Sequence, residues 1–229
     1  KISQDKEQKY YNFSYPFFNN AFDGEICSSF GSDLIEEGYV LLTTDYTESK
    51  GILYLHKIGT GTMKKVAENV YPAQRLVSGN GKFFYWGITS MPRASETIFD
   101  GIWMCDIETG QQKQLVSKEE LQKMTQVASA GELFLDTNGR LYFEVSKEDL
   151  CCYNREFFSL SPDDPNDLQK EEKMTEKLAD CQYIKTYFED TLYFEDGDGE
   201  YEEDIYTYDL KSGKIKKLKN GSPFAEVGY

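Results

Sequence analysis

One hairpin pattern, repeated along the chain, constrains this fold more than any other feature of the sequence. Its clearest copy is residues 205–218, where a short aromatic strand leads into Asp-Leu-Lys-Ser-Gly and then into a second strand. Residues 102–115 repeat this order closely, and residues 53–66 repeat it more loosely. A fourth copy, residues 157–168, keeps the aromatic strand but has Pro-Asp-Asp-Pro-Asn in place of the glycine turn. The chain is therefore predicted to be an array of one β-hairpin unit.

Two further strands are expected before each hairpin. The nearer strands are apolar and comprise Tyr39–Thr44, Lys82–Ile88, residues 140–145 and Thr191–Asp196. Three of them follow a tight turn, at residues 80–81, 138–139 and 189–190, and the first two of these turns read Asn-Gly. Asn-Gly between apolar runs is a strong hairpin signal because both residues tolerate positive φ. The preceding strand candidates are residues 74–78, 132–136 and 181–188. Each unit is thus predicted to hold four antiparallel strands.

The spacing of the units points to one architecture. The equivalent residues Leu53, Ile102, Phe157 and Ile205 follow one another at intervals of 49, 55 and 48 positions. Periods of this size with four strands per unit are typical of β-propeller blades. We predict an all-β, propeller-like array of four or five four-stranded antiparallel blades, in a single domain over residues 1–229. The units fall roughly at residues 33–69, 70–117, 125–175 and 179–220. The two termini either complete or close a blade, or the chain is a piece of a longer propeller.

Helix is expected only as insertions between the units. Residues 117–124 read Ser-Lys-Glu-Glu-Leu-Gln-Lys-Met, which places a good N-cap before a run of helix formers. Residues 169–178 form a charged stretch of similar composition. Both are interpreted as additions to the repeat.

The hairpin pattern also resembles a known family. Residues 205–218 and 102–115 share hydrophobic-Tyr/Trp-x-x-Asp-Leu/Ile-x-Ser/Thr-Gly-x-x-x-x-Leu. This pattern is similar to the third and fourth strands of blades in TolB-like and related bacterial β-propellers, and Gly-Arg-Leu-Tyr-Phe at 139–143 resembles their second strand. The resemblance extends over about residues 33–218 and concerns the blade rather than one specific family. It implies an extracytoplasmic setting, secreted or associated with the cell envelope, and it transfers no functional residue.

Charge and composition exclude several classes of partner. The chain has 25 Lys and Arg against 40 Asp and Glu, a net charge of −15. Nucleic acids and anionic membrane surfaces attract clustered Lys and Arg, so neither is an expected partner. No apolar run approaches the roughly 18 residues of a membrane span, so membrane insertion is not expected. The five Cys are an odd number, so at least one lacks a partner within the chain, and their pairing stays open.

Catalytic patterns are weak in this sequence. The single His, His56, occupies a hairpin position that Cys105 and Tyr208 fill in other copies, so a packing role is favoured over a catalytic one. No Gly-x-Ser-x-Gly or phosphate-binding glycine loop occurs. We therefore expect no enzyme. The rival hypothesis is a carbohydrate-active enzyme whose carboxylates lie in the central channel.

An acidic stretch at residues 195–204 is the candidate for metal binding. Asp196, Asp198 and Glu200 alternate in it, and Ca²⁺ prefers several close carboxylates. The stretch departs from an EF-hand loop, which requires Gly where Tyr201 stands. The favoured interpretation is a solvated loop between the second and third strands of the last unit, with no cofactor. A calcium-stabilised structural domain is the alternative.

Two other variable loops, residues 89–100 and 146–155, occupy the same place in their units. Loops on one face of a repeat scaffold commonly form binding sites. The candidate binding residues on this face are Arg93, Phe99, Tyr153, Arg155 and Tyr201. Exposed aromatic side chains beside Arg suit protein or carbohydrate contacts. The sequence thus predicts a binding module that recognises protein or glycan through the loops between second and third strands.

Overall fold

The computed structural model describes residues 26–27, 39–44, 51–57, 63–70, 76–88, 99–126, 129–147, 154–179, 183–196 and 204–218. Within these residues the chain is mostly β, with strands β1 to β16 and two short helices, α3 and α4. The strands group into four antiparallel units, which we call blades 1 to 4.

The strands of each blade follow the chain order. Blade 1 holds β1 (Ile26–Cys27), β2 (Tyr39–Thr44), β3 (Gly51–Lys57) and β4 (Met63–Val70). Blade 2 holds β5 (Leu76–Gly79), β6 (Lys82–Ile88), β7 (Phe99–Asp106) and β8 (Gln112–Ser117). Blade 3 holds β9 (Ser129–Leu135), β10 (Leu141–Ser146), β11 (Arg155–Ser161) and β12 (Asp164–Lys170). Blade 4 holds β13 (Tyr183–Phe188), β14 (Thr191–Asp196), β15 (Asp204–Asp209) and β16 (Ile215–Lys217). A single residue pair, Val70 with Gly87, joins blades 1 and 2 into one continuous sheet.

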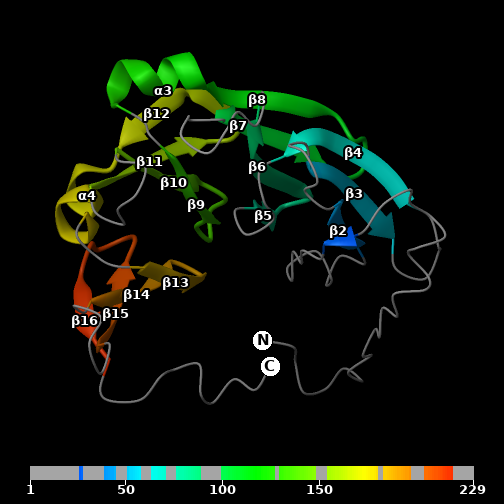
Figure 1. Ribbon diagram of the computed structural model, residues 1–229. Coiled ribbons are helices and arrows are strands. Elements are labelled where there is room, and N and C mark those ends of the chain that lie inside the picture. The colour runs from blue at the N-terminus through cyan, green and yellow to red at the C-terminus, as the bar shows by residue number, and fades with distance from the viewer. Residues whose placement is uncertain are drawn as a thin grey trace, which may run out of the picture.

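The blades succeed one another along an arc, as Figure 1 shows. The inner side of the arc is formed by β5, β9 and β13, and its outer side by β4, β8, β12 and β16. This is the arrangement of a β-propeller, in which the first strand of each blade is innermost. The all-β, propeller-like fold predicted from the repeat is confirmed.

The element boundaries agree closely with the sequence. Strands β2, β6 and β14 have the predicted bounds, while β1 adds a strand before residue 33, where the first unit was expected to begin. Helix α3 (Lys118–Met124) begins after Ser117, which forms a reciprocal capping box with Glu120. Helix α4 is confined to Glu172–Leu178. The expected helical stretch from residue 169 is therefore wrong at its start, because β12 continues to Lys170 and pairs with β11.

The repeated Asp-x-x-Ser/Thr-Gly sequence is a turn motif. The Asp209 carboxylate accepts a hydrogen bond of 2.6 Å from the Ser212 backbone N–H, and Gly213 takes a φ of +63°. In blade 2, the Asp106 carboxylate accepts from the Thr109 backbone N–H at 2.7 Å in the same way. The carboxylate closes the loop and the glycine turns the chain back, so the motif repeats because the turn repeats.

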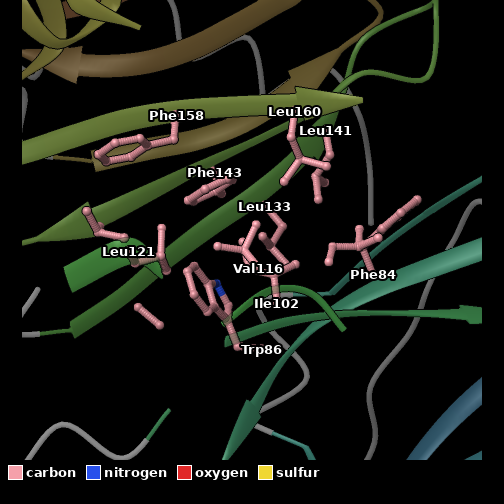
Figure 2. Close-up of a cluster of buried hydrophobic side chains, with 13 residues drawn as sticks. Phe84, Trp86, Ile102, Val116, Leu121, Leu133, Leu141, Phe143, Phe158 and Leu160 are labelled. Atoms are coloured by element: carbon pink, nitrogen blue, oxygen red, sulfur yellow. The ribbon is translucent and has the colours of Figure 1, made fainter. Parts of the chain in front are cut away.

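Apolar side chains fill the space between neighbouring blades. Figure 2 shows the cluster between blades 2 and 3, which includes Trp86. Trp86 is fully buried, meets the Phe143 ring edge-on at 5.8 Å, and donates its indole N–H to the Gly131 carbonyl at 2.9 Å. A second cluster lies between blades 3 and 4, and it includes Phe157 and Phe194 together with Leu178 of α4. Blades 2 and 3, and likewise blades 3 and 4, thus cover each other's apolar faces, which is the stabilising principle of a repeat array.

Candidate ligand-binding cleft between blades 2 and 3

The hairpin turns of the blades share one end of the propeller. In an antiparallel blade, the turn from first to second strand and the turn from third to fourth strand lie at the same end of the sheet. We call this end the turn face. The connections from second to third strand lie at the opposite end, which we call the loop face.

A cleft of about 360 Å³ opens on the turn face between blades 2 and 3. Three turns meet there: the β5–β6 turn of blade 2, and the β9–β10 and β11–β12 turns of blade 3. Phe84, Leu135 and Pro162 contribute apolar surface, and polar side chains of all three turns complete the lining. Ligand sites commonly combine an apolar surface with a few convergent polar groups in a volume of this order.

The β11–β12 turn is unusually short for this chain. Ser161 pairs directly with Asp164, so Pro162 and Asp163 alone make the turn. In blades 2 and 4 the corresponding pairs are residues 105 with 112 and 208 with 215, and the longer glycine turns lie between them. The short turn is the copy of the repeat in which Pro-Asp-Asp-Pro-Asn replaces the glycine turn.

The longer turn of blade 4 closes the equivalent place between blades 3 and 4. Asp190 accepts hydrogen bonds from the backbone N–H and the hydroxyl of Thr137, both at 2.9 Å. Lys211, within the longer turn, pairs with Asp190 and donates to the Thr137 hydroxyl at 3.3 Å. The Lys211 ammonium and the Thr137 donors lower the pKa of Asp190 to about 2. The two-residue β11–β12 turn of blade 3 is too short to cover the equivalent space between blades 2 and 3, and the cleft lies there.

Two charged residues of the cleft maintain its shape. Both the Asn138 and the Arg140 backbone N–H groups donate to one Asp136 carboxylate oxygen at 2.8 Å, which fixes the β9–β10 turn. The Arg140 guanidinium donates to the Ser159 hydroxyl at 2.9 Å and forms an ion pair with Asp167. This hydrogen-bonded ion pair holds the pKa of the Asp167 carboxyl below its usual range. Asp136 and Arg140 are therefore occupied by contacts within blade 3.

The remaining polar side chains of the cleft make weaker contacts, and among them the Asn138 amide donates a long hydrogen bond of 3.5 Å to the Asp136 carboxylate. The Lys82 ammonium lies 3.0 Å from the Asp163 carboxylate, whose side chain is 85% exposed. Exposed ion pairs of this kind contribute little stability and exchange readily with water or ligand. The exposed side-chain amides of Asn80 and Asn138 and the half-buried Ser161 hydroxyl border the same space.

The binding residues predicted from sequence were assigned to the loop face, and none of those that the structure describes lines this cleft. Arg93, Tyr153, Tyr201, Asp198 and Glu200 lie outside the described residues. Phe99 is the first residue of β7, where it pairs with Ile88, and Asp196 is the last residue of β14, where it pairs with Asp204. Their assignments to a ligand or a metal stay predictions.

Arg155 is placed differently from the expectation. It is the first residue of β11 rather than a loop residue, and only 7% of it is exposed. Its guanidinium lies 3.6 Å from the Glu144 carboxylate, which is also buried. The prediction of an exposed Arg155 on a loop rim is wrong, because the strand carries it into the space between blades 3 and 4.

Metal and nucleophile chemistry finds little support in the described part of the chain. No cluster of three or more His, Cys, Asp or Glu residues there could hold a metal ion. Cys105 is fully buried, and burial raises the pKa of its thiol to about 11, which disfavours the reactive thiolate. No helix among these residues is both long and apolar enough to cross a membrane.

Comparison with known proteins establishes the fold and no more. No family model and no curated protein matches the chain. TolB from Acinetobacter baumannii superposes with a TM-score of 0.50 at 11% identity, over 85% of this chain and 43% of that chain. A puromycin-hydrolysing peptidase of Mycobacterium tuberculosis gives a TM-score of 0.50 at 11% identity, over 86% of this chain and 28% of that chain. A prolyl endopeptidase gives a TM-score of 0.52 at 11% identity, over 87% of this chain and 29% of that chain.

This chain therefore spans less than half the length of each of these structures. The likeness confirms the β-propeller fold and the resemblance to TolB-like blades. At these identities it shows architecture alone, and the neighbours include peptidases as well as TolB.

Proposed function

We propose that this chain is a non-enzymatic binding module that recognises a protein or glycan through the cleft between blades 2 and 3. The short Pro162-Asp163 turn carries the proposal. The regular repeat would extend this turn, as it does in blade 4, where Lys211 bridges to the neighbouring blade. A repeat protein commonly binds where one unit departs from the pattern, because the other units supply a rigid frame.

The frame around the cleft suits recognition. Asp136 fixes the backbone of one turn, and Arg140 is anchored by Ser159 and Asp167. Phe84 and Leu135 of the lining also belong to the apolar cluster between the two blades, which holds them in place. A site whose lining is already ordered loses little conformational entropy when a ligand binds.

The described carboxylates of the cleft favour binding over catalysis. A general acid or base must reach a substrate proton directly or through one water. Asp136 accepts two backbone hydrogen bonds within its own turn, and Asp163 faces the Lys82 ammonium. We propose that neither carboxylate acts as a general acid or base on a bound ligand. Release of reducing ends from a bound glycan would overturn this and favour the carbohydrate-active alternative.

We also propose an extracytoplasmic setting for the protein, on the strength of its TolB-like blades. Fractionation of the producing cells tests this separately from the cleft. Recovery of the protein only with cytoplasmic markers would contradict the setting and leave the binding proposal intact.

The test of binding uses a blocking variant on a glycan array and in a pull-down from envelope extract. Asn138→Trp places a large ring on an exposed turn residue that borders the cleft. Glu108→Trp is the matched control, since Glu108 is an exposed turn residue of blade 2 that does not line the cleft. We expect Asn138→Trp to lose the captured ligand and Glu108→Trp to keep it. Equal retention by both variants contradicts the proposed site.

A further inference from the structure

The formal charges that line the cleft cancel. Lys82 and Arg140 each contribute one positive charge, while Asp136 and Asp163 each contribute one negative charge. Arg140 is already bound to Asp167, and Lys82 lies beside Asp163. An anionic ligand would meet Asp136 and Asp163, and a cationic ligand would meet Lys82 and Arg140. Like charges brought together in a partly desolvated site weaken binding, so a neutral ligand is favoured.

The polar groups open to a ligand offer both donors and acceptors. The side-chain amides of Asn80 and Asn138 each provide one carbonyl oxygen and one NH₂ group, and the Ser161 hydroxyl can donate or accept. Lys82 adds further N–H donors beside these groups. Hydroxyl groups on a ligand match this mixture, because each can donate one hydrogen bond and accept two.

The apolar surface of the cleft lies next to this polar border. The half-buried Leu135 offers carbon surface to a space of about 360 Å³, and Phe84 and Pro162 line the same space but are themselves buried. Such a volume lies near the lower end of the roughly 300–1,000 Å³ typical of ligand pockets, so it accepts a small ligand or the end of a chain. A sugar ring has the matching character, since its C–H groups cover apolar surface while its hydroxyls reach outward.

We infer that the cleft binds the end of a neutral saccharide, one or two rings in length. This inference rests on the proposed function and narrows its ligand class. The structural element that permits it is the Pro162-Asp163 turn, and the residues that bind the hydroxyls are Asn80, Lys82, Asn138 and Ser161.

The test compares neutral and acidic saccharides displayed on one array. The probes are neutral hexose and N-acetylhexosamine oligosaccharides, with matched oligosaccharides that carry a uronate ring. Multivalent display compensates for the weak affinity expected of so small a ligand. We expect the parent protein to bind neutral probes at least about tenfold more tightly than uronate probes. Asn138→Ala should weaken neutral binding about three- to tenfold, as expected for one lost hydrogen bond.

A charge variant adds a readout that a merely structural role would not change. Asp163→Asn removes one negative charge from the lining and frees the Lys82 ammonium from its ion pair. The affinity for uronate probes should then rise about threefold or more relative to the affinity for neutral probes. Asp164→Asn removes the same charge one residue along, from a side chain that does not line the cleft, and should leave the preference unchanged.

The possible failures are distinguishable. If Asn138→Trp abolishes binding only to uronate probes or to a peptide pool, the neutral-saccharide inference is overturned while the proposed function survives. If no probe on either platform depends on Asn138, the proposed function fails together with the inference. If Asp163→Asn prefers neutral over uronate probes as strongly as the parent does, the charged residues of the cleft do not select the ligand, and the inference is overturned.

Discussion

Replacement of Trp86 by Phe tests how blades 2 and 3 hold the cleft between them. Trp86 is a fully buried member of the cluster that joins these blades, and its indole N–H is bound to the Gly131 carbonyl at 2.9 Å. Phenylalanine keeps an aromatic ring at this position but has no N–H. The Gly131 residue is itself buried, so its carbonyl loses this hydrogen bond without ready access to water.

The expected cost follows from these contacts. Leaving a buried acceptor without its donor costs about 1–3 kcal/mol. The smaller ring leaves part of the volume unfilled, which costs about 1 kcal/mol, as for other small core truncations. Together the free energy of unfolding should fall by about 2–4 kcal/mol. For a chain of this length that lowers the Tm by about 5–15 °C.

Trp103→Phe is the matched control, since the chain has two Trp. Trp103 is only half-buried and donates at 2.9 Å to the Asp100 carboxylate, which is also partly exposed and can bind water instead. Urea unfolding followed by far-UV circular dichroism should give a loss below about 1 kcal/mol for this variant. A larger loss for Trp103→Phe than for Trp86→Phe would refute the reasoning. So would a loss below about 1 kcal/mol for Trp86→Phe.

Two further predictions concern the contacts between and within blades 3 and 4. The pKa of Asp190 is lowered to about 2 by Lys211 and Thr137, so the stability it contributes is present above pH 4 and is lost as the pH falls toward 2. The difference in unfolding free energy between parent and Asp190→Asn should therefore shrink over this range in urea titrations, and a constant difference would contradict the assignment. Gly131→Ala would place a Cβ 1.8 Å from Cγ of the buried Glu144, so about 1–3 kcal/mol of stability should be lost in the same assay. An unchanged midpoint would show that the Glu144 side chain can move aside.

The repeat made the blade predictable because its signals are local. Asn-Gly turns, aromatic alternation and Asp-x-x-Ser/Thr-Gly each act within a few residues, so strands β2, β6 and β14 could be bounded from sequence alone. The capping box of Ser117 and Glu120 likewise depends on a spacing of three residues. The start of α4 was missed because pairing with β11 extends β12 to Lys170, and pairing is a contact between distant segments.

The cleft could not be found in the same way. Its lining comes from turns around residues 80, 138 and 162, which the chain brings together only when blades 2 and 3 stack. The sequence did contain a signal, since Pro162-Asp163 stands where the other hairpins have their glycine turn. Its meaning depends on Lys211 reaching Asp190 and Thr137 in the neighbouring pair of blades. Arg155 was also misplaced from sequence, because this last residue of a predicted loop begins β11 and is buried against Glu144.

The most direct test of the cleft is to close it with the chain's own turn. Replacing residues 161–164 by Asp-Leu-Lys-Ser-Gly-Lys, the sequence at 209–214, gives blade 3 the longer turn of blade 4 together with the Asp that closes it. The measurement is ligand capture on the glycan array and in the envelope pull-down, with circular dichroism to confirm the fold. We predict that the folded graft loses the ligand that the parent captures. A folded graft that captures it as well as the parent would contradict the central claim that the short turn opens the binding site.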